Sequence, residues 1–210
     1  KGCINCFFPQ IYVFYFLWDN INDTQLEKFK RMKESLVLKN IFDRDDVYES
    51  KNLNKTSSGI DQLAKFKEIK AESWTAFSNY ITDLTRLAFD GDLKTRWHSG
   101  LPQKSDIAFT IDLKDTYRIN AISIELGKYY RDYPRELSLK GSKDSILWKD
   151  IPIQNNILFD LLYSSITSPK NVTYTIVFQK IQSRYIKLTL SRTHDINYWS
   201  IPKIKVYSEG

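Results

Sequence analysis

Two cysteines and two histidines are the side chains of this sequence most suited to metal chemistry. Cys3 and Cys6 have the C-x-x-C spacing that supplies half of a tetrahedral zinc site. His98 and His194 lie far along the chain, so neither forms a second ligand pair close to the cysteines. We therefore interpret the cysteines as small apolar residues within a hydrophobic stretch rather than as zinc ligands.

Sequence motifs of the common enzyme classes are missing. The chain has no G-x-S-x-G, no phosphate-binding P-loop, no H-E-x-x-H and no dinucleotide fingerprint. Each of these motifs places a nucleophile, a metal or a phosphate in a defined backbone geometry, and nothing in this sequence substitutes for them. We therefore expect no catalytic activity in this chain.

Composition indicates a folded protein that is not a nucleic-acid binder. The 210 residues are 42% hydrophobic, 27% charged and 14% aromatic, which suits one main domain plus an appendage. Aromatic side chains at this level serve both thick β cores and surfaces that stack on sugars. The formal charge is +6, but lysines are interleaved with acidic residues and do not form basic runs. We predict no nucleic-acid partner, whereas an anionic membrane surface nearby suits the charge.

Residues 1–60 are expected to form an appendage to the main domain. Residues 3–18 are almost entirely apolar, and the unbroken run of eight at 11–18 is too short for a spanning helix, which needs roughly 20 residues. We interpret this stretch as a buried strand or as the tail of a membrane segment in a fragment of a longer chain. A capped amphipathic helix is predicted over 22–38 and a polar linker over 43–59.

Residues 61–210 have the period of a β protein. Apolar and polar residues alternate over several short runs with no helical segment expected between them, which predicts half-buried antiparallel strands. The predicted fold class is mainly β, an antiparallel jelly-roll sandwich with an N-terminal helical appendage. The predicted strands cover residues 107–113, 119–126, 137–141, 172–178, 185–190 and 204–207.

A colinear series of short segments between about residues 69 and 208 also resembles a known family. The segments are 88–97, 111–113, 119–124, 133–135, 140–148, 184–188 and 204–207. Together they are similar to the discoidin domain, also called the coagulation factor V/VIII type C domain. The versions at 95–103, 132–135 and 198–201 are, more narrowly, similar to discoidin modules at the C-terminal end of bacterial membrane glycosyltransferases.

The resemblance implies a galactose-binding-like jelly roll that binds ligands without catalysis. Members bind glycans, or anionic phospholipid in the coagulation branch, through loops at one end of the sandwich. In this chain the corresponding loops are residues 97–106, 128–135 and 193–200.

The three loops contain the side chains that a sugar site needs. A pyranose presents an apolar face and a rim of hydroxyls, so it requires an aromatic surface beside fixed donors and acceptors. The candidate stacking residues are Tyr129, Tyr130, Tyr133, Tyr198 and Trp199. The candidate hydroxyl partners are Arg96, His98, Gln103, Asp132, Arg135, His194 and Asp195. The arginine fork also suits a carboxylate on an acidic sugar.

Several of the aromatic candidates have a structural alternative. Trp97 follows an Asp-Gly turn and is expected to belong to the core because of its apolar size. Tyr133 precedes a proline and is biased to extended geometry, so it is also suited to positioning the strand that follows. Trp199 stands at a strand entrance, where half burial is the alternative to ligand contact.

The polar candidates have alternatives too. Arg135 is equally suited to pairing with Asp132 and bracing its loop. His98 and His194, in polar loops, are alternatively ordinary solvent-facing residues. Asp132 with Asp195 is the one carboxylate pair at the expected ligand end, but no feature of the sequence marks either for hydrolysis.

The resemblance also raises calcium as a cofactor. Sugar-binding members often hold calcium with the Asp-Gly turn, a threonine and a late acidic residue; here Asp90, Asp92 and Thr95 match the first part. The late acid is replaced at about Lys203, whose ammonium would occupy the place of the cation against Asp90. The alternative is that Asp90 and Thr95 only close a tight turn through their own hydrogen bonds.

The leading functional hypothesis is a noncatalytic carbohydrate-binding module. We expect it to be extracytoplasmic, membrane-associated through a parent membrane glycosyltransferase, and to bind a glycan or glycolipid. The first alternative is a phospholipid-binding domain, for which Tyr80 and Ile81 in the loop at 78–83 form the obvious apolar tip. The second alternative is a structural protein-interaction domain whose end loops pack against the rest of its parent protein.

Overall fold

The computed structural model describes residues 59–155 and 157–209. The chain divides into two units, residues 1–56 and 57–210, and the described residues belong to the second. The predicted apolar segment and helix, and all but the last residue of the predicted linker, lie outside the described residues.

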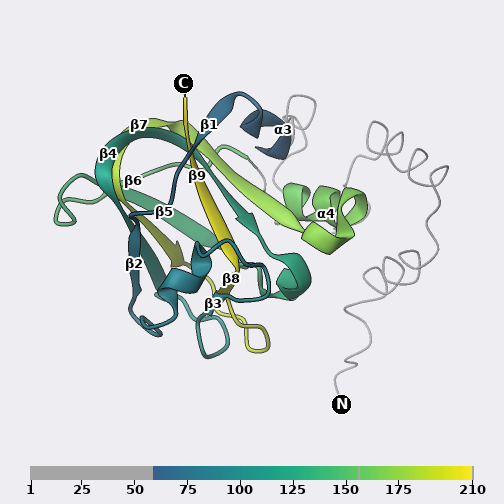
Figure 1. Ribbon diagram of the computed structural model, residues 1–210. Coiled ribbons are helices and arrows are strands. Elements are labelled where there is room, and N and C mark those ends of the chain that lie inside the picture. Colours follow the sequence, from purple (N-terminus) through teal and green to yellow (C-terminus); the bar gives the residue numbers. More distant parts are fainter. Residues whose placement is uncertain (1–58, 156, 210) are drawn as a thin grey trace, which may run out of the picture. The chain divides into compact units, whose positions relative to one another are not determined.

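The described chain consists of strands with short helices between them (Figure 1). The elements, with η for 3₁₀ helices, are α3 (Gly59–Leu63), β1 (Phe66–Ile69), β2 (Thr75–Ser78), η4 (Thr85–Ala88), β3 (Trp97–His98), β4 (Ala108–Glu125), η5 (Gly127–Asp132), β5 (Leu137–Ser142), β6 (Lys149–Asp150), α4 (Ile157–Thr167), η6 (Pro169–Asn171), β7 (Thr173–Leu190), β8 (Ser200–Ile201) and β9 (Lys203–Glu209). Every pairing between these strands is antiparallel, which confirms the predicted fold class.

Two long strands build both layers of the sandwich. In one layer, residues 108–112 of β4 pair with 185–189 of β7, and β2 and β5 flank them. In the other layer, residues 121–125 of β4 pair with 173–177 of β7, and β9 and then β1 continue the sheet. The register shifts near the middle of β4, and Figure 1 shows β4 and β7 curving together. The predicted short strands at 107–113 and 119–126 are therefore two halves of one bent strand.

The core lies between the two layers and explains the sequence pattern. Phe109, Ile111, Ile122 and Ile124 of β4 are fully buried, as are their counterparts on β7 and β9. Burying one branched side chain of this kind contributes about 1.5–3 kcal/mol, so the apolar positions determine which face of each strand points inward.

The helix α4, between β6 and β7, was not predicted. Its buried residue Asp160 accepts hydrogen bonds from the backbone N–H groups of Gly59 and Thr175, at 2.9 and 3.0 Å, which anchors the helix to α3 and β7. The prediction of strands without intervening helices was wrong here, because an apolar run such as Ile157–Thr167 does not show its period clearly. Among the described residues, no helix has the length and apolar character needed to cross a membrane.

A buried carboxylate fixes the bend between the layers. Asp112 accepts hydrogen bonds from Arg184 Nε and Nη2 at 2.8 and 3.0 Å and from the backbone N–H of Lys114 at 2.8 Å. Lys114 has a φ of +70°, a left-handed conformation that the Asp112 carboxylate stabilises. The Arg184 guanidinium lowers the pKa of Asp112 from 3.8 to about 2.

The Asp112→Asn variant is expected to be less stable by about 2 kcal/mol at pH 7, because it loses charge-assisted hydrogen bonds. The wild-type carboxyl is more acidic in the folded state, so its contribution is complete above pH 3.8 and is lost as the pH falls towards 2. Urea denaturation between pH 7 and 2 should therefore show a steeper loss of stability below pH 4 for wild type than for the variant. Asp150→Asn, at a carboxylate whose side chain is 81% exposed, is the control. Parallel pH profiles for wild type and Asp112→Asn would contradict this account.

Candidate functional site

The three predicted loops meet at one end of the sandwich. Strand β3 pairs with β8, which joins the loop at 97–106 to the end of the loop at 193–200. Gln103 and His194 form a further isolated antiparallel bridge between the same two loops. The third loop, 128–135, is attached by side-chain contacts.

Gln103 supplies three of those contacts. Its carboxamide Nε2 donates to the carbonyl oxygens of Tyr133 and Tyr198 at 2.8 and 2.9 Å, and its Oε1 accepts from the Arg135 N–H at 3.0 Å. The side chain is completely buried. The prediction that Gln103 contacts a ligand was wrong, because both ends of its amide are already bound to the backbone of neighbouring loops. Its role is to hold the three loops together.

Two tryptophans form the floor beneath the loops. Trp97 and Trp199 are fully buried and pack edge to face with ring centroids 5.1 Å apart. Trp97 Nε1 donates to the Ile81 carbonyl at 2.7 Å, which confirms its expected place in the core. The prediction that Trp199 contacts a ligand was wrong, because the neighbouring loops cover it completely.

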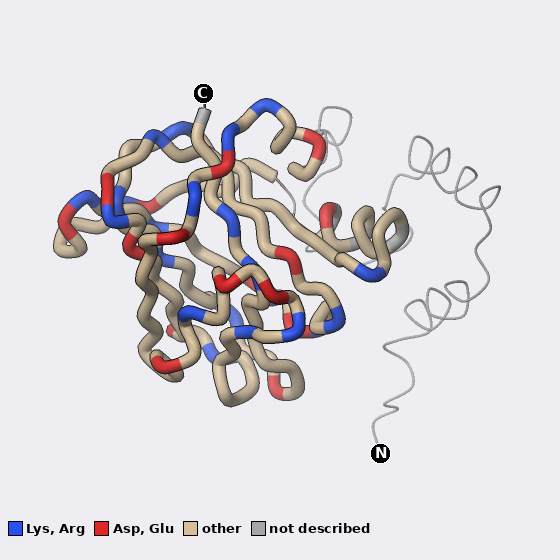
Figure 2. The backbone as a smooth tube through the Cα atoms, in the orientation of Figure 1, with Lys and Arg blue, Asp and Glu red and all other residues tan. Residues whose placement is uncertain are grey.

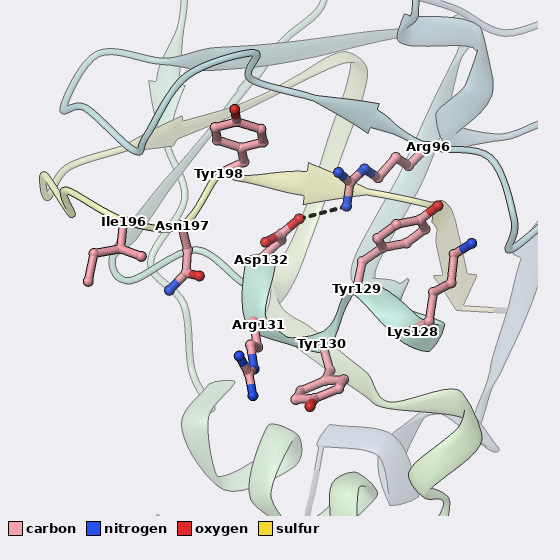
Figure 3. A pocket seen from close by; sticks show the side chains of 9 residues that line it. All are labelled: Arg96, Lys128, Tyr129, Tyr130, Arg131, Asp132, Ile196, Asn197 and Tyr198. Atoms are coloured by element: carbon pink, nitrogen blue, oxygen red, sulfur yellow. Dashed lines mark hydrogen bonds and ion pairs between the residues drawn. The ribbon is translucent and has the colours of Figure 1, made fainter. Parts of the chain in front are cut away.

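An open pocket of about 430 Å³ lies between η5 and the end of the loop at 193–200 (Figure 3). It brings together five of the candidate residues from the sequence: Arg96, Tyr129, Tyr130, Asp132 and Tyr198. The remaining lining residues are Lys128, Arg131, Ile196 and Asn197, which were not predicted.

An ion pair between Arg96 and Asp132 forms part of the pocket lining. Arg96 Nη1 donates to Asp132 Oδ2 at 2.8 Å, and the Ser200 hydroxyl donates to the same oxygen at 2.7 Å. The Arg96 guanidinium carbon also lies 3.9 Å from the centre of the Tyr129 ring. Asp132 and Arg96 are 15% and 23% exposed, so both still reach solvent inside the pocket. This pair and ring form a fixed polar wall of the kind that orients hydroxyl groups.

Tyr198 and His98 form a stacked pair at the pocket edge. Their rings are 5.8 Å apart and nearly parallel, at 16°, and Tyr198 is 37% exposed. His98 Nδ1 accepts the Gly100 N–H at 3.1 Å. Burial, followed by the nearby Arg96 charge, lowers the pKa of His98, so near neutral pH its proton lies on Nε2. Position 100 favours glycine, because its φ is +73° and a Cβ there would push the end of the Ile81 side chain aside.

Two other predicted residues, Tyr133 and Arg135, contact each other outside the lining of this pocket. Arg135 stacks on Tyr133, with its guanidinium carbon 3.8 Å from the ring centre, and its Nη2 donates to the Arg131 carbonyl at 3.3 Å. Among the described residues, Arg135 Nη1 is buried without a hydrogen-bond partner. The suggested brace between Arg135 and Asp132 was wrong, because the Asp132 carboxylate binds Arg96 and Ser200.

His194 and Asp195 do not join the pocket. His194 Nδ1 accepts the N–H groups of Ile196 and Asn197 at 3.4 and 3.3 Å, which closes the turn that carries these two lining residues. Burial and the charge of Arg135 lower the pKa of His194. Asp195 is exposed beside the turn.

The turn matched to the family's calcium site is closed by its own hydrogen bonds. Thr95 Oγ1 donates to Asp90 Oδ2 at 2.7 Å, and the Asp92 N–H donates to Asp90 Oδ1 at 2.9 Å. Lys203 does not face Asp90 as expected, because its ammonium pairs with Glu125 at 3.5 Å. In 59–155 and 157–209 no three His, Cys, Asp or Glu side chains gather as metal ligands. Calcium takes six to eight oxygen ligands, and the side chains of Asp90, Asp92 and Thr95 supply only part of such a set. Calcium binding at this turn stays a prediction.

The unpredicted lining residues are sequence neighbours of predicted ones. Lys128 and Arg131 flank the tyrosines of η5, and Ile196 and Asn197 precede Tyr198. Their position in the predicted ligand loops is the feature of the sequence that could have identified them. Lys128 and Arg131 are cations rather than stacking residues, so residue type alone did not mark them as part of a sugar site.

Comparison with known proteins agrees with this architecture. The family model described as F5/8 type C domain matches residues 68–203. No curated protein sequence matches the chain.

Three solved structures are similar to the chain at 16–20% identity, a level that shows the fold alone. CpGH89CBM32-5 from Clostridium perfringens, in complex with GalNAc-β-1,3-galactose, has a TM-score of 0.52 at 16% identity and covers 68% of this chain and 100% of its own. The family 32 CBM from C. perfringens NanJ, in complex with galactose, has a TM-score of 0.51 at 16% identity, with 68% and 98% covered. Truncated AlyQ with CBM32 and alginate lyase domains has a TM-score of 0.51 at 20% identity, with 69% and 34% covered.

The Gln103→Glu variant is expected to be less stable by about 3 kcal/mol. The replacement keeps the shape of the side chain but points a carboxylate oxygen at two carbonyl oxygens in a buried position. Urea denaturation at pH 7 measures the loss, and Gln154→Glu, at an exposed position, is the control. A loss of less than 0.5 kcal/mol, within the usual range for surface substitutions, would show that the loops do not depend on this amide.

Proposed function

This chain belongs to the F5/8 type C domain family, and we propose that it is a noncatalytic carbohydrate-binding module whose ligand site is the pocket between η5 and Tyr198. The observation that carries the proposal is the combination of tyrosine rings and a fixed Arg96–Asp132 pair around one open pocket. A pyranose needs both an apolar surface and oriented hydrogen-bonding groups.

The geometry supplies each part of such a site. Tyr198 exposes part of its ring at the pocket edge and is backed by His98, so stacking on it costs little conformational entropy. Asp132 provides carboxylate oxygens as hydroxyl acceptors, and the Arg96 guanidinium provides donors. Since Gln103 holds the loops together, these groups are positioned before a ligand arrives.

The pocket favours binding over hydrolysis. Glycoside hydrolysis usually needs two carboxyl groups on opposite sides of the bond that is broken. The lining contains one carboxylate, Asp132, which already accepts two hydrogen bonds, and Asp195 is not part of it. The module therefore holds its sugar without transforming it.

The ligands named for two similar structures guide the first tests. CpGH89CBM32-5 was solved with GalNAc-β-1,3-galactose and the NanJ module with galactose. Because this chain shares their fold, galactose and N-acetylgalactosamine glycans are the reasonable first ligands.

A membrane glycosyltransferase parent is part of the same proposal. It rests on the similarity of segments 95–103, 132–135 and 198–201 to the C-terminal modules of such enzymes. In the structure these segments gather at the loop end around the pocket. The module would then be extracytoplasmic and would hold the acceptor or product of its parent, a glycan or glycolipid. The sequence upstream of this chain tests the parentage: several transmembrane helices with an acidic motif in the first external loop would support it, and their absence would refute it.

The phospholipid-binding alternative has less support, because the apolar tip expected in the loop at 78–83 is only partly exposed. Ile81 is half-buried against Gly100, and its carbonyl accepts the Trp97 indole N–H. Tyr80 alone is exposed there, at 37%. One aromatic ring is a weak membrane anchor compared with an amphipathic surface.

The Tyr198→Ala variant is expected to bind glycans about tenfold more weakly, because it removes the stacking surface, a change of about 1.4 kcal/mol. The measurement is a glycan array probed with the 210-residue chain, followed by calorimetric titration with the best neutral ligand. Tyr80→Ala is the matched control, since it removes the same residue type at the same exposure outside the pocket, and it should bind like wild type. An array without sugar-dependent signal, or equal binding by both variants, would refute the proposed site.

A further inference from the structure

The charge around the pocket is unbalanced. Three cationic side chains line it, those of Arg96, Lys128 and Arg131, against the single carboxylate of Asp132 (Figure 3). Figure 2 shows basic and acidic positions interspersed along the rest of the described chain. The excess of positive charge among the lining residues is the feature that sets this pocket apart from a neutral sugar site.

The one carboxylate is already neutralised within the protein. Asp132 Oδ2 accepts a hydrogen bond from Arg96 at 2.8 Å and another from Ser200 at 2.7 Å. Both members of the ion pair are less than one quarter exposed, so solvent screens their interaction weakly. Lys128 also lines the pocket, and its charge is available to a ligand that enters it.

Lys128 is the cation best placed to meet a ligand. It is exposed, and its ammonium lies 5.0 Å from the centre of the Tyr129 ring, which also carries the Arg96 guanidinium at 3.9 Å. The Tyr129 hydroxyl donates to the Lys94 carbonyl at 2.8 Å, which holds the ring in place. Within 59–155 and 157–209 no carboxylate lies within ion-pair distance of Lys128.

The apolar part of the pocket, formed by Ile196 and Tyr198, suits the apolar face of a sugar ring. Ile196 is 80% exposed and Tyr198 is 37% exposed, and both lie across the pocket from Lys128 (Figure 3). A small inorganic anion would leave this side without a partner. A ligand that satisfies both sides has an apolar ring face and a negative group on the same molecule.

We propose that this pocket selects an acidic glycan, with the pyranose against Tyr198 and its anionic group, a carboxylate or a sulfate, beside Lys128. The inference rests on the proposed function and specifies its ligand class. Charge-assisted hydrogen bonds to such a group are about twice as strong as neutral ones, so they discriminate between acidic and neutral sugars with the same backbone.

The test compares matched ligands on the 210-residue chain. Galacturonate, glucuronate and mannuronate oligomers, their carboxyl-reduced forms and a sulfated galactan are titrated by calorimetry at 50 and 300 mM NaCl. We expect at least one acidic form to bind about tenfold more tightly than its neutral counterpart, with the preference shrinking at the higher salt concentration. The carboxylate and sulfate arms identify which anionic group is preferred.

Charge-removing variants locate the effect. Lys128→Gln should weaken binding of the acidic ligand about fivefold and leave the neutral ligand unchanged. Lys104→Gln is the matched control, because Lys104 is exposed in the loop at 97–106 but does not line the pocket. Neutral ligands that bind as tightly as acidic ones, or a Lys128→Gln variant with wild-type preference, would overturn the acidic-glycan inference while leaving the proposed function intact. If neither ligand class binds, the proposed function itself fails.

Discussion

One buried carboxamide determines the shape of the ligand end. Gln103 bonds to the backbone at Tyr133, Arg135 and Tyr198, positions that are 30 to 95 residues away along the chain. A buried amide without partners costs free energy, so moving either neighbouring loop away from Gln103 leaves part of its amide unpaired. Because of this constraint, the loops form a single pre-organised wall. The buried tryptophans Trp97 and Trp199, which pack edge to face, fill space that the loops cover.

The polar groups of the pocket follow from that arrangement. Once the loops are fixed, Asp132 reaches both Arg96 and Ser200, and the Tyr129 ring lies beneath two cations. The Asp132 carboxylate is then bound to groups of the protein itself, while the Lys128 ammonium is exposed to solvent. The proposed binding role and the proposed preference for acidic sugars both follow from the pairing of Asp132 with Arg96 and Ser200.

Sequence reasoning predicted the layers better than the site. Period-two alternation identified β4, β5, β7 and β9 but not the shorter strands β1, β2, β3, β6 and β8. Size placed Trp97 in the core, because burial in a sheet leaves a local pattern. The joining of two predicted strands into β4 was not visible, since the alternation continues on each side of the bend at Asp112. Gln103 and Trp199 were assigned to ligand contact because residue type and loop position do not report burial. Their partners lie far away in sequence, and only the folded chain brings them together.

The most direct test of the central claim, that three distant loops form one sugar site, is an NMR titration of the 210-residue chain with its best glycan ligand. The account predicts that the amide signals that shift most belong to residues 96–98, 128–132 and 196–200, which surround the pocket. Shifts confined to one of these loops, or centred on the exposed hairpin tip at Ile146 and Leu147, would contradict it.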